Sequence, residues 1–162
     1  MMEKAREILL RIVREPGFEE GTHWRRRAFE TDEVIVREGD VAQRMYLIEQ
    51  GQLRVMGQVA LDDQRKIKPG LADLGPGDLF GEMTLFEKHP RTATVTAIEP
   101  GRLLEIDCVA LSGYLDAHPE TGYLLLKALF QVLMERLSKA NERLEHLFAW
   151  GLKAHGIDKH LR

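Results

Sequence analysis

Residues 80–95 read FGEMTLFEKHPRTATV, and this stretch decides both the fold and the chemistry that we predict. The glycine turn at Gly81 leads into a short helix start, where exposed backbone amides attract an anion. The guanidinium of Arg91 offers a fork of donors that matches phosphate oxygens. The carboxylate of Glu82 can accept a hydrogen bond from a sugar hydroxyl. With a small residue at Ala93 leaving room for a ligand, the stretch predicts a site for a cyclic phosphodiester joined to a ribose.

This stretch resembles the phosphate-binding cassette of the cyclic nucleotide-binding domain family, which joins a Phe-Gly-Glu start to a Pro-Arg pair through a variable loop. The similarity extends over about residues 26–147, as in the sensor domains of catabolite-activator-type regulators and of cAMP-dependent kinase regulatory subunits. It implies a mainly β fold, a β-roll of the jelly-roll type with a short N-terminal helix and a long C-terminal helix. One departure is Thr84, where the family usually has Ala, Ser or Gly. Its hydroxyl can add a bond to the phosphate, or its methyl can crowd the site.

The pattern along the chain agrees with that architecture. Residues 1–24 form an N-terminal helical segment, since apolar residues recur at helical spacing before Pro16. Residues 25–108 contain short apolar runs separated by glycine, which is typical of a β-roll. The strands are predicted at 34–36, 46–48, 53–55, 94–97 and 103–106. Residues 109–150 are predicted to be helices that act as a lid or a dimer contact, and residues 151–162 a short tail.

Composition excludes several classes of protein. The chain has 162 residues and a net charge of −3, so nothing indicates general affinity for nucleic acid or an anionic membrane. Its single cysteine, Cys108, cannot form an internal disulfide, which fits a reducing compartment. The charged N-terminus is not a signal peptide, and no apolar run is long enough for a membrane span. We therefore expect a cytoplasmic protein.

The long C-terminal helix carries an apolar pattern with alternating steps of three and four residues. The positions are Tyr123, Leu126, Phe130, Leu133, Leu137, Ala140, Leu144 and Leu147. Such a heptad seam favours a homodimer through this helix, because a small roll cannot easily cover so long a stripe. The dimeric catabolite-activator regulators also pair through the helix that follows the roll. The alternative is that the same stripe packs along the protein's own β-roll.

The resemblance assigns roles to the residues of the cassette. Arg91 would bind the exocyclic phosphate oxygens; without the motif it would be an ordinary surface arginine. Glu82 would hold the ribose 2′-hydroxyl, and a carboxylate there also favours the helix start by itself. Gly81 would supply a backbone conformation that other residues resist. The complete set of predicted ligand-binding residues is Phe80, Gly81, Glu82, Met83, Thr84, Arg91, Thr92 and Ala93.

Two further residues concern the base. Thr92 resembles a threonine that bonds guanine in some cGMP-selective members, although many cAMP binders also have Thr or Ser there. Asn141 lies where catabolite-activator proteins contact adenine across the dimer, and its amide could bond either purine edge. Its alternative role is that of a solvated helix residue. The resemblance therefore favours cAMP as the ligand and leaves cGMP open.

The sequence gives less support to other functions. The six histidines lack the spacing of a β-roll metal site, and no nucleophile motif is present, so we expect no metal and no enzyme. The basic triplet 25–27 is a solvated edge or a nucleic-acid patch. We expect a stand-alone cyclic nucleotide sensor whose ligand moves the C-terminal helix, acting on an unidentified effector protein. Alternatives are a truncated catabolite-activator regulator, since the residues after Trp150 are too few for DNA binding through a helix-turn-helix, and an interaction domain without a ligand.

Overall fold

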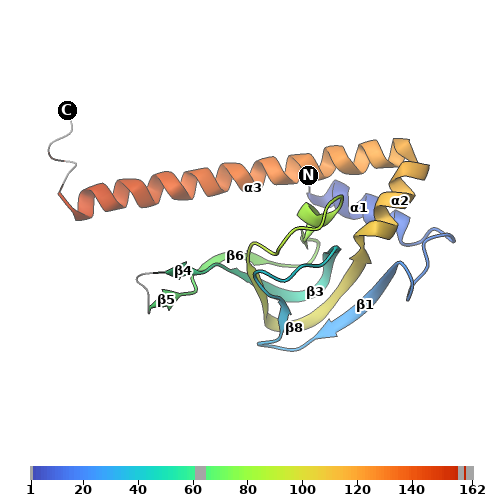
Figure 1. Ribbon diagram of the computed structural model, residues 1–162, viewed down its shortest axis with the longest axis horizontal. Coiled ribbons are helices and arrows are strands. Elements are labelled where there is room, and N and C mark those ends of the chain that lie inside the picture. Colours follow the sequence, from blue (N-terminus) through green and yellow to red (C-terminus); the bar gives the residue numbers. More distant parts are fainter. Residues whose placement is uncertain (1, 61–64, 157–158, 160–162) are drawn as a thin grey trace.

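The computed structural model describes residues 2–60, 65–156 and 159 and has an antiparallel sheet with helices packed against it (Figure 1). The helices are α1 (Met2–Ile12), the 3₁₀ turn η1 (Glu82–Thr84), α2 (Cys108–Ala117) and α3 (Pro119–Ala154). The strands are β1 (Trp24–Phe29), β2 (Val34–Val36), β3 (Arg44–Met56), β4 (Val59–Ala60), β5 (Lys66–Ile67), β6 (Gly70–Leu74), β7 (Leu79–Phe80) and β8 (Thr94–Asp107).

Two long strands organise the sheet. β3 and β8 pair with each other along most of their length, β1 and β2 pair with β8, and β6 and β7 pair with β3. The order β1-β8-β3-β6 leaves β6 at an edge, and β4 with β5 forms a separate two-stranded sheet that extends below the far half of α3 (Figure 1). The predicted fold, mainly β with a short N-terminal and a long C-terminal helix, is confirmed.

The prediction that glycines end several strands was wrong at two positions. Residues 46–48 and 53–55 lie in one strand, β3, and residues 94–97 and 103–106 lie in β8. Gly51, with a φ of +85°, lies so close to the backbone of Pro100 that a Cβ atom would be 2.6 Å from the Pro100 carbonyl oxygen. A Cβ at Gly101 would be 2.0 Å from the carbonyl oxygen of Gln50. These glycines therefore allow two continuous strands to touch where their register shifts.

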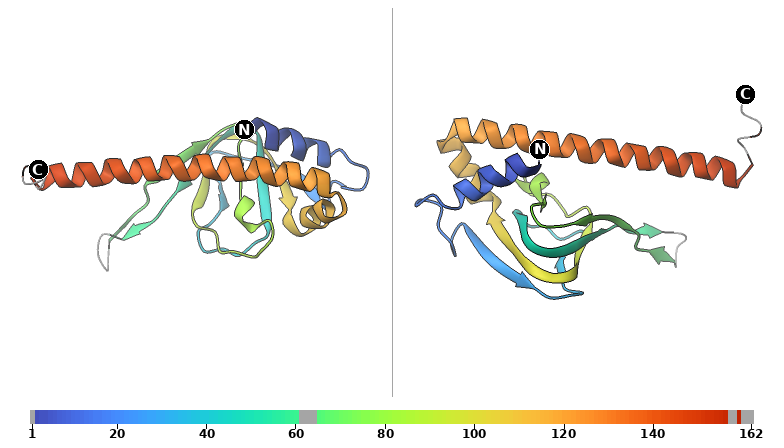
Figure 2. Two further views of the ribbon diagram at one scale, coloured as in Figure 1. Left: turned by 90° about the horizontal axis from the view of Figure 1, so that it is seen from above. Right: turned by 180° about the vertical axis from the view of Figure 1, so that it is seen from behind.

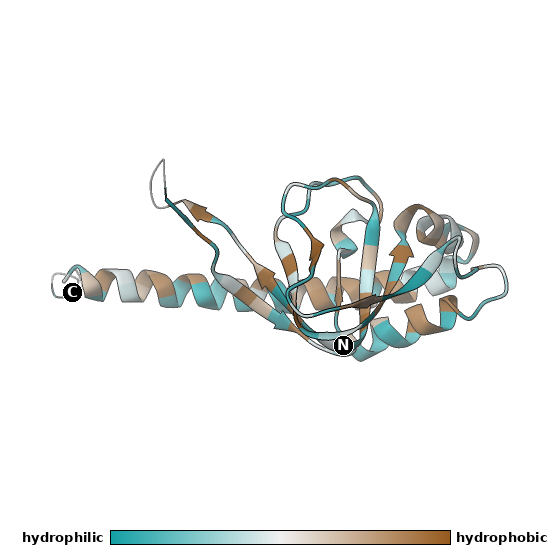
Figure 3. Cartoon of the chain, turned by 90° about the horizontal axis from the view of Figure 1, so that it is seen from below, coloured by the Kyte–Doolittle hydropathy of each residue, from teal (hydrophilic) through white to brown (hydrophobic). Residues whose placement is uncertain are grey.

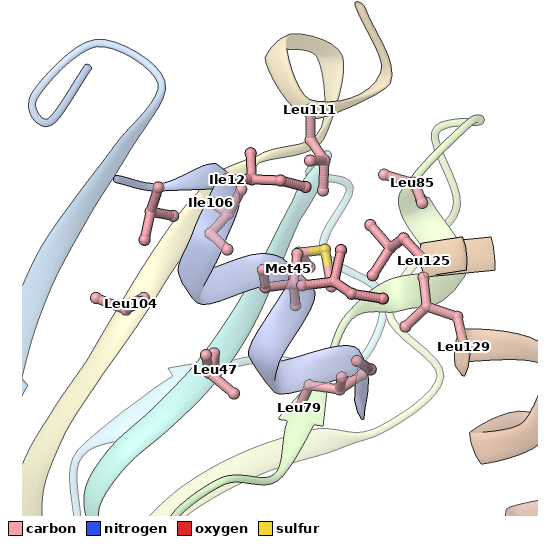
Figure 4. Packing of buried hydrophobic residues seen from close by; sticks show 14 of the residues in the cluster. Ile12, Met45, Leu47, Leu79, Leu85, Leu104, Ile106, Leu111, Leu125 and Leu129 are labelled. Atoms are coloured by element: carbon pink, nitrogen blue, oxygen red, sulfur yellow. The ribbon is translucent and has the colours of Figure 1, made fainter. Parts of the chain in front are cut away.

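The main hydrophobic core joins the sheet to all three α-helices. Figure 4 shows Ile12 of α1, Met45 of β3, Ile106 of β8, Leu111 of α2 and Leu125 of α3 gathered in one cluster. α2 begins directly after β8, where the side chain of Asp107 accepts a hydrogen bond of 2.9 Å from the Ala110 amide. The core therefore fixes the first turns of α3 relative to the sheet.

The apolar stripe that α3 buries is not the heptad seam. Its buried residues are Gly122, Leu125, Ala128, Leu129 and Val132. The seam residues are exposed in the single chain, for example Phe130 at 63% and Leu144 at 67%. Figures 2 and 3 show that α3 continues well past the β-roll with apolar residues recurring along it. Leu133, Leu137 and Ala140 of the seam nevertheless line a cavity that the β-roll also lines, so packing against the roll and pairing with a second copy both stay predictions.

Each arginine of the triplet has a carboxylate partner within the chain, and two of these carboxylates are shared, Glu105 with Arg44 and Glu49 with Arg102. The ion pairs of the triplet are Arg25 with Glu105 at 3.0 Å, Arg26 with Glu49 at 3.3 Å and Arg27 with Glu33 at 2.7 Å. These ion pairs favour the interpretation of the triplet as a solvated edge of the sheet. Within the described residues, no helix has the length and apolar character needed to cross a membrane.

Candidate functional site

A cavity of about 490 Å³ lies between the cassette, the β-roll and α3. Its apolar wall comes from β2, β3 and β6 through Val36, Val55, Leu71, Ala72 and Leu74. All eight predicted ligand-binding residues line it: Phe80, Gly81, Glu82, Met83, Thr84, Arg91, Thr92 and Ala93. The structure thus brings both ends of the cassette to one cavity, because β7 and β8 hold them against β3.

Arg91 is buried and held in place, with 8% of its surface exposed. Its Nη2 donates a hydrogen bond of 2.7 Å to the carbonyl oxygen of Arg44, and its guanidinium carbon lies 5.7 Å from the centre of the Tyr46 ring. Tyr46 in turn stacks on Phe80 with ring centres 4.7 Å apart. Burial raises the pKa of the Tyr46 hydroxyl. The Nε of Arg91 is buried and has no hydrogen-bond partner, so one donor of a fixed guanidinium is unsatisfied.

Glu82 is the acidic counterpart of Arg91 in the same cavity. It follows Gly81, whose φ of +81° and close approach to the Arg44 carbonyl oxygen, 2.7 Å from a Cβ atom placed there, exclude a side chain. Glu82 Oε1 accepts a hydrogen bond of 2.9 Å from Nη1 of Arg136 on α3. Glu82 Oε2 is buried and has no partner. A buried carboxylate oxygen without a donor is costly, so the cavity leaves one acceptor as well as one donor unsatisfied.

Thr84 turns its hydroxyl into the cassette. The hydroxyl donates to the carbonyl oxygen of Gly81 at 2.9 Å and lies 3.8 Å from the sulfur of Cys108. Because the Thr84 hydroxyl already donates to Gly81, the geometry does not favour the other predicted role of this hydroxyl, a hydrogen bond to the phosphate. Burial raises the pKa of the Cys108 thiol to about 11, so the thiol stays protonated near neutral pH.

Three cations on α3 were not predicted as site residues. Arg136, Lys139 and Arg143 line the cavity beside Leu133, Leu137 and Ala140. Arg136 and Arg143 are one heptad apart and so share a helix face, which is a signal that could have indicated them. Asn141 is exposed and does not line the cavity of its own chain, so its predicted contact with a base requires a second copy and stays a prediction.

The cavity is electrostatically suited to an anion. Among its lining residues the cations are Arg91, Arg136, Lys139 and Arg143, and the only carboxylate is Glu82. This cationic excess stands out in a chain whose net charge is −3. Across residues 2–60, 65–156 and 159, no group of three or more His, Cys, Asp or Glu side chains could hold a metal ion.

Comparison with known proteins defines the class. Residues 26–118 match the family model described as "Cyclic nucleotide-binding domain", and the chain belongs to that family. It is 32% identical over 119 residues to the CRP-like cAMP-activated global transcriptional regulator of Mycobacterium tuberculosis, covering 74% of this chain and 50% of the regulator. The chain thus spans about half the length of this curated relative.

Solved structures agree with the fold. The catabolite activator protein of Thermus thermophilus superposes with a TM-score of 0.64 at 30% identity, over 76% of this chain and 55% of that one. A cyclic nucleotide-binding domain from Methylobacillus flagellatus superposes with a TM-score of 0.68 at 24% identity, over 88% of this chain and 81% of that one. At this identity the second likeness supports the fold alone.

Proposed function

We propose that this chain is a non-catalytic sensor that binds cAMP and couples its occupancy to movement of α3. The observation that carries the proposal is the pair of unsatisfied groups in one cavity, Glu82 Oε2 and Arg91 Nε. A cyclic nucleotide complements both, since its phosphate accepts hydrogen bonds from Arg91 while its ribose 2′-hydroxyl donates one to Glu82. The names of the regulator from Mycobacterium tuberculosis and of the Thermus thermophilus activator point to regulation.

The choice of cAMP over cGMP is supported by a relative. The regulator from Mycobacterium tuberculosis is described as cAMP-activated, and it is 32% identical to this chain over the 119 residues that match. Thr92 lines the cavity and is exposed, so its hydroxyl remains accessible to either base. A role for Asn141 at the base would come from a partner copy, as the heptad seam on α3 suggests.

Coupling to α3 would pass through Arg136. Arg136 joins Glu82 to α3 and also donates to the carbonyl oxygen of Leu79. A ribose hydroxyl that binds Glu82 changes the surroundings of this ion pair, so the ligand acquires different affinities for different positions of α3. Such differential affinity is what turns binding into a switch. A dimer through the exposed seam would transmit the change to an effector protein. A reducing, cytoplasmic compartment fits this role and the single buried thiol.

Isothermal titration of the chain with cAMP, and separately with cGMP, tests the proposal. Saturable binding at one site per chain, with the tighter constant for cAMP, is expected. Absence of heat together with absence of thermal stabilisation by either nucleotide would contradict it, because ligand binding to the folded state must raise its stability. In that case the cavity would belong to an interaction domain without a ligand.

Glu82→Ala should remove discrimination between cAMP and 2′-deoxy-cAMP. In the unmodified chain we expect 2′-deoxy-cAMP to bind about tenfold more weakly, because the buried Glu82 Oε2 stays unsatisfied with it. Glu82→Ala removes that acceptor, so the two ligands should bind with equal and weaker affinity. Competition titration measures both constants. A preference for cAMP that survives in Glu82→Ala would place the ribose elsewhere.

A regulator of the catabolite-activator type is the second candidate. This candidate is favoured by the sequence identity of 32% to the transcriptional regulator of Mycobacterium tuberculosis, because the matched residues cover 50% of that regulator. In that case the chain would be the sensor half of a DNA-binding protein. Reading the coding sequence beyond Arg162 for a helix-turn-helix distinguishes this candidate from a stand-alone sensor.

A further inference from the structure

An apolar groove of about 500 Å³ lies between the cassette and the first half of α3, beside the nucleotide cavity. Leu85 and Phe86 of the cassette line one side of this groove, and residues of the heptad seam line the other. Phe86 is 60% exposed, although its side chain is strongly apolar. Glu82 and Leu133 line both the groove and the nucleotide cavity. Whatever fills the groove therefore contacts the same element that a nucleotide would bind.

The seam side of the groove repeats with the period of a coiled coil. Tyr123 and Phe130 take position a of the heptad, and Leu126 and Leu133 take position d. Tyr123 and Phe130 are 64% and 63% exposed in the single chain. A seam of this period is complementary to a helix with the same repeat, and α3 of a second copy is such a helix. A two-fold pairing would place the groove of each copy beside the seam of the other.

The residues that flank the seam are compatible with a parallel pair of helices. In a parallel pair, position g of one helix lies beside position e of the other helix, five residues later. Arg136 then faces Asn141 of the second copy, and Arg143 faces Phe148. Over residues 122–148, none of the four pairs between positions g and e brings two like charges together. No electrostatic repulsion therefore opposes the parallel pairing at these positions.

One of these pairs lies at the groove. Leu129 takes position g and lines the groove together with Phe86, so its counterpart in a second copy is Met134 at position e. Met134 is 50% exposed in the single chain. The methionine side chain is flexible, fills irregular gaps and contacts aromatic rings favourably through its sulfur. It therefore suits a groove that contains an exposed phenylalanine.

We propose that Met134 of a second copy fills the groove beside Phe86, which makes the cassette part of the dimer interface. This inference rests on the proposed sensor and its dimer through the seam. It adds a contact between the nucleotide-binding element of one copy and α3 of the other. Because the groove comes from one copy and the methionine from the other, a two-fold dimer contains this contact twice.

Two charged variants, measured alone and as a mixture, test this contact. Phe86→Glu and Met134→Lys each place a charge in the groove, so each variant alone should dimerise at least about tenfold more weakly than the unmodified chain. In an equimolar mixture, a heterodimer has one unchanged groove and one groove in which the introduced carboxylate meets the introduced ammonium group. The mixture should therefore return to nearly the dimer fraction of the unmodified chain, as measured by sedimentation velocity.

Val109→Glu is the matched control for the added charge. Val109 on α2 is 61% exposed and lines neither the groove nor the nucleotide cavity, so this variant should dimerise like the unmodified chain. A mixture that is no more dimeric than its two components overturns the contact, because a contact within one chain cannot be restored by mixing. Dimerisation of Phe86→Glu at the unmodified level, or an unmodified chain that stays monomeric, overturns it as well.

Titration with cAMP separates this inference from the proposed function. Neither Phe86 nor Met134 lines the nucleotide cavity, so the Phe86→Glu chain should still bind cAMP after its dimerisation is weakened. Failure of the unmodified chain to bind any cyclic nucleotide overturns the sensor, whereas the dimer fraction of the mixture still decides whether the cassette contacts a second copy.

Discussion

Replacing Arg91 with alanine should weaken cyclic nucleotide binding by at least about a hundredfold, or about 3 kcal/mol. Its guanidinium is buried, fixed by the Arg44 carbonyl and the Tyr46 ring, and retains a donor without a partner. A phosphate anion in the cavity would lose its charge-assisted hydrogen bonds to the guanidinium. Isothermal titration with cAMP measures the change.

Arg102→Ala is the matched control for this prediction. Arg102 is on β8, 47% exposed, and pairs with Glu49 at 2.8 Å away from the cavity lining. Its loss should leave the affinity unchanged, because exposed ion pairs contribute little. A thermal melt shows whether Arg91→Ala remains folded, since Arg91 also bonds the β3 backbone. Unchanged affinity in a folded Arg91→Ala protein would remove the assignment of Arg91 to the phosphate.

Introducing Leu144→Glu together with Leu147→Glu should convert a dimer into monomers. Both leucines belong to the heptad seam and are 67% and 66% exposed in the single chain, so their burial is available only to a partner. Two carboxylates from each copy would then have to be buried in an apolar seam. Sedimentation velocity measures the change in mass.

Leu144 and Leu147 are the seam positions chosen for substitution because neither lines the cavity. Leu133 and Leu137 also belong to the seam, but both line the cavity, so charges there would disturb ligand binding as well. The control is Ser138→Glu with Ala149→Glu, which adds the same charge to the exposed helix surface away from the seam. A dimer that persists in the Leu144 and Leu147 variant would place the interface on another surface.

The sequence predicts those parts of the site whose residues lie close together in the chain, and it does not predict contacts between residues that are far apart in the chain. The cassette residues were predictable because a glycine turn, a carboxylate and an arginine lie close together in the chain. The contacts of Arg136 with Glu82 and of Arg143 with Leu71 were not, because they connect residues 54 and 72 positions apart. Such pairs depend on where α3 crosses the roll, and residue spacing does not contain that information.

The helix and the long strands illustrate the same limit. α3 carries two apolar stripes, and only the core that forms around Leu125 and Leu129 decides which of them is buried. Gly51 and Gly101 resemble turn glycines when each is considered alone. In the structure they allow the backbones of β3 and β8 to approach each other closely, and this approach requires glycine at both positions.

The length of α3 has a mechanical consequence. The helix has 36 residues, and the 18 residues after Arg136 extend about 27 Å beyond the contact with Glu82. A tilt of about 10° at that contact would displace the last turn by about 5 Å, since a helix moves as a rigid rod over such a length. A change of one hydrogen bond at the ribose end of the cavity can thus be amplified into a displacement as large as a full helical turn at the far end of the protein.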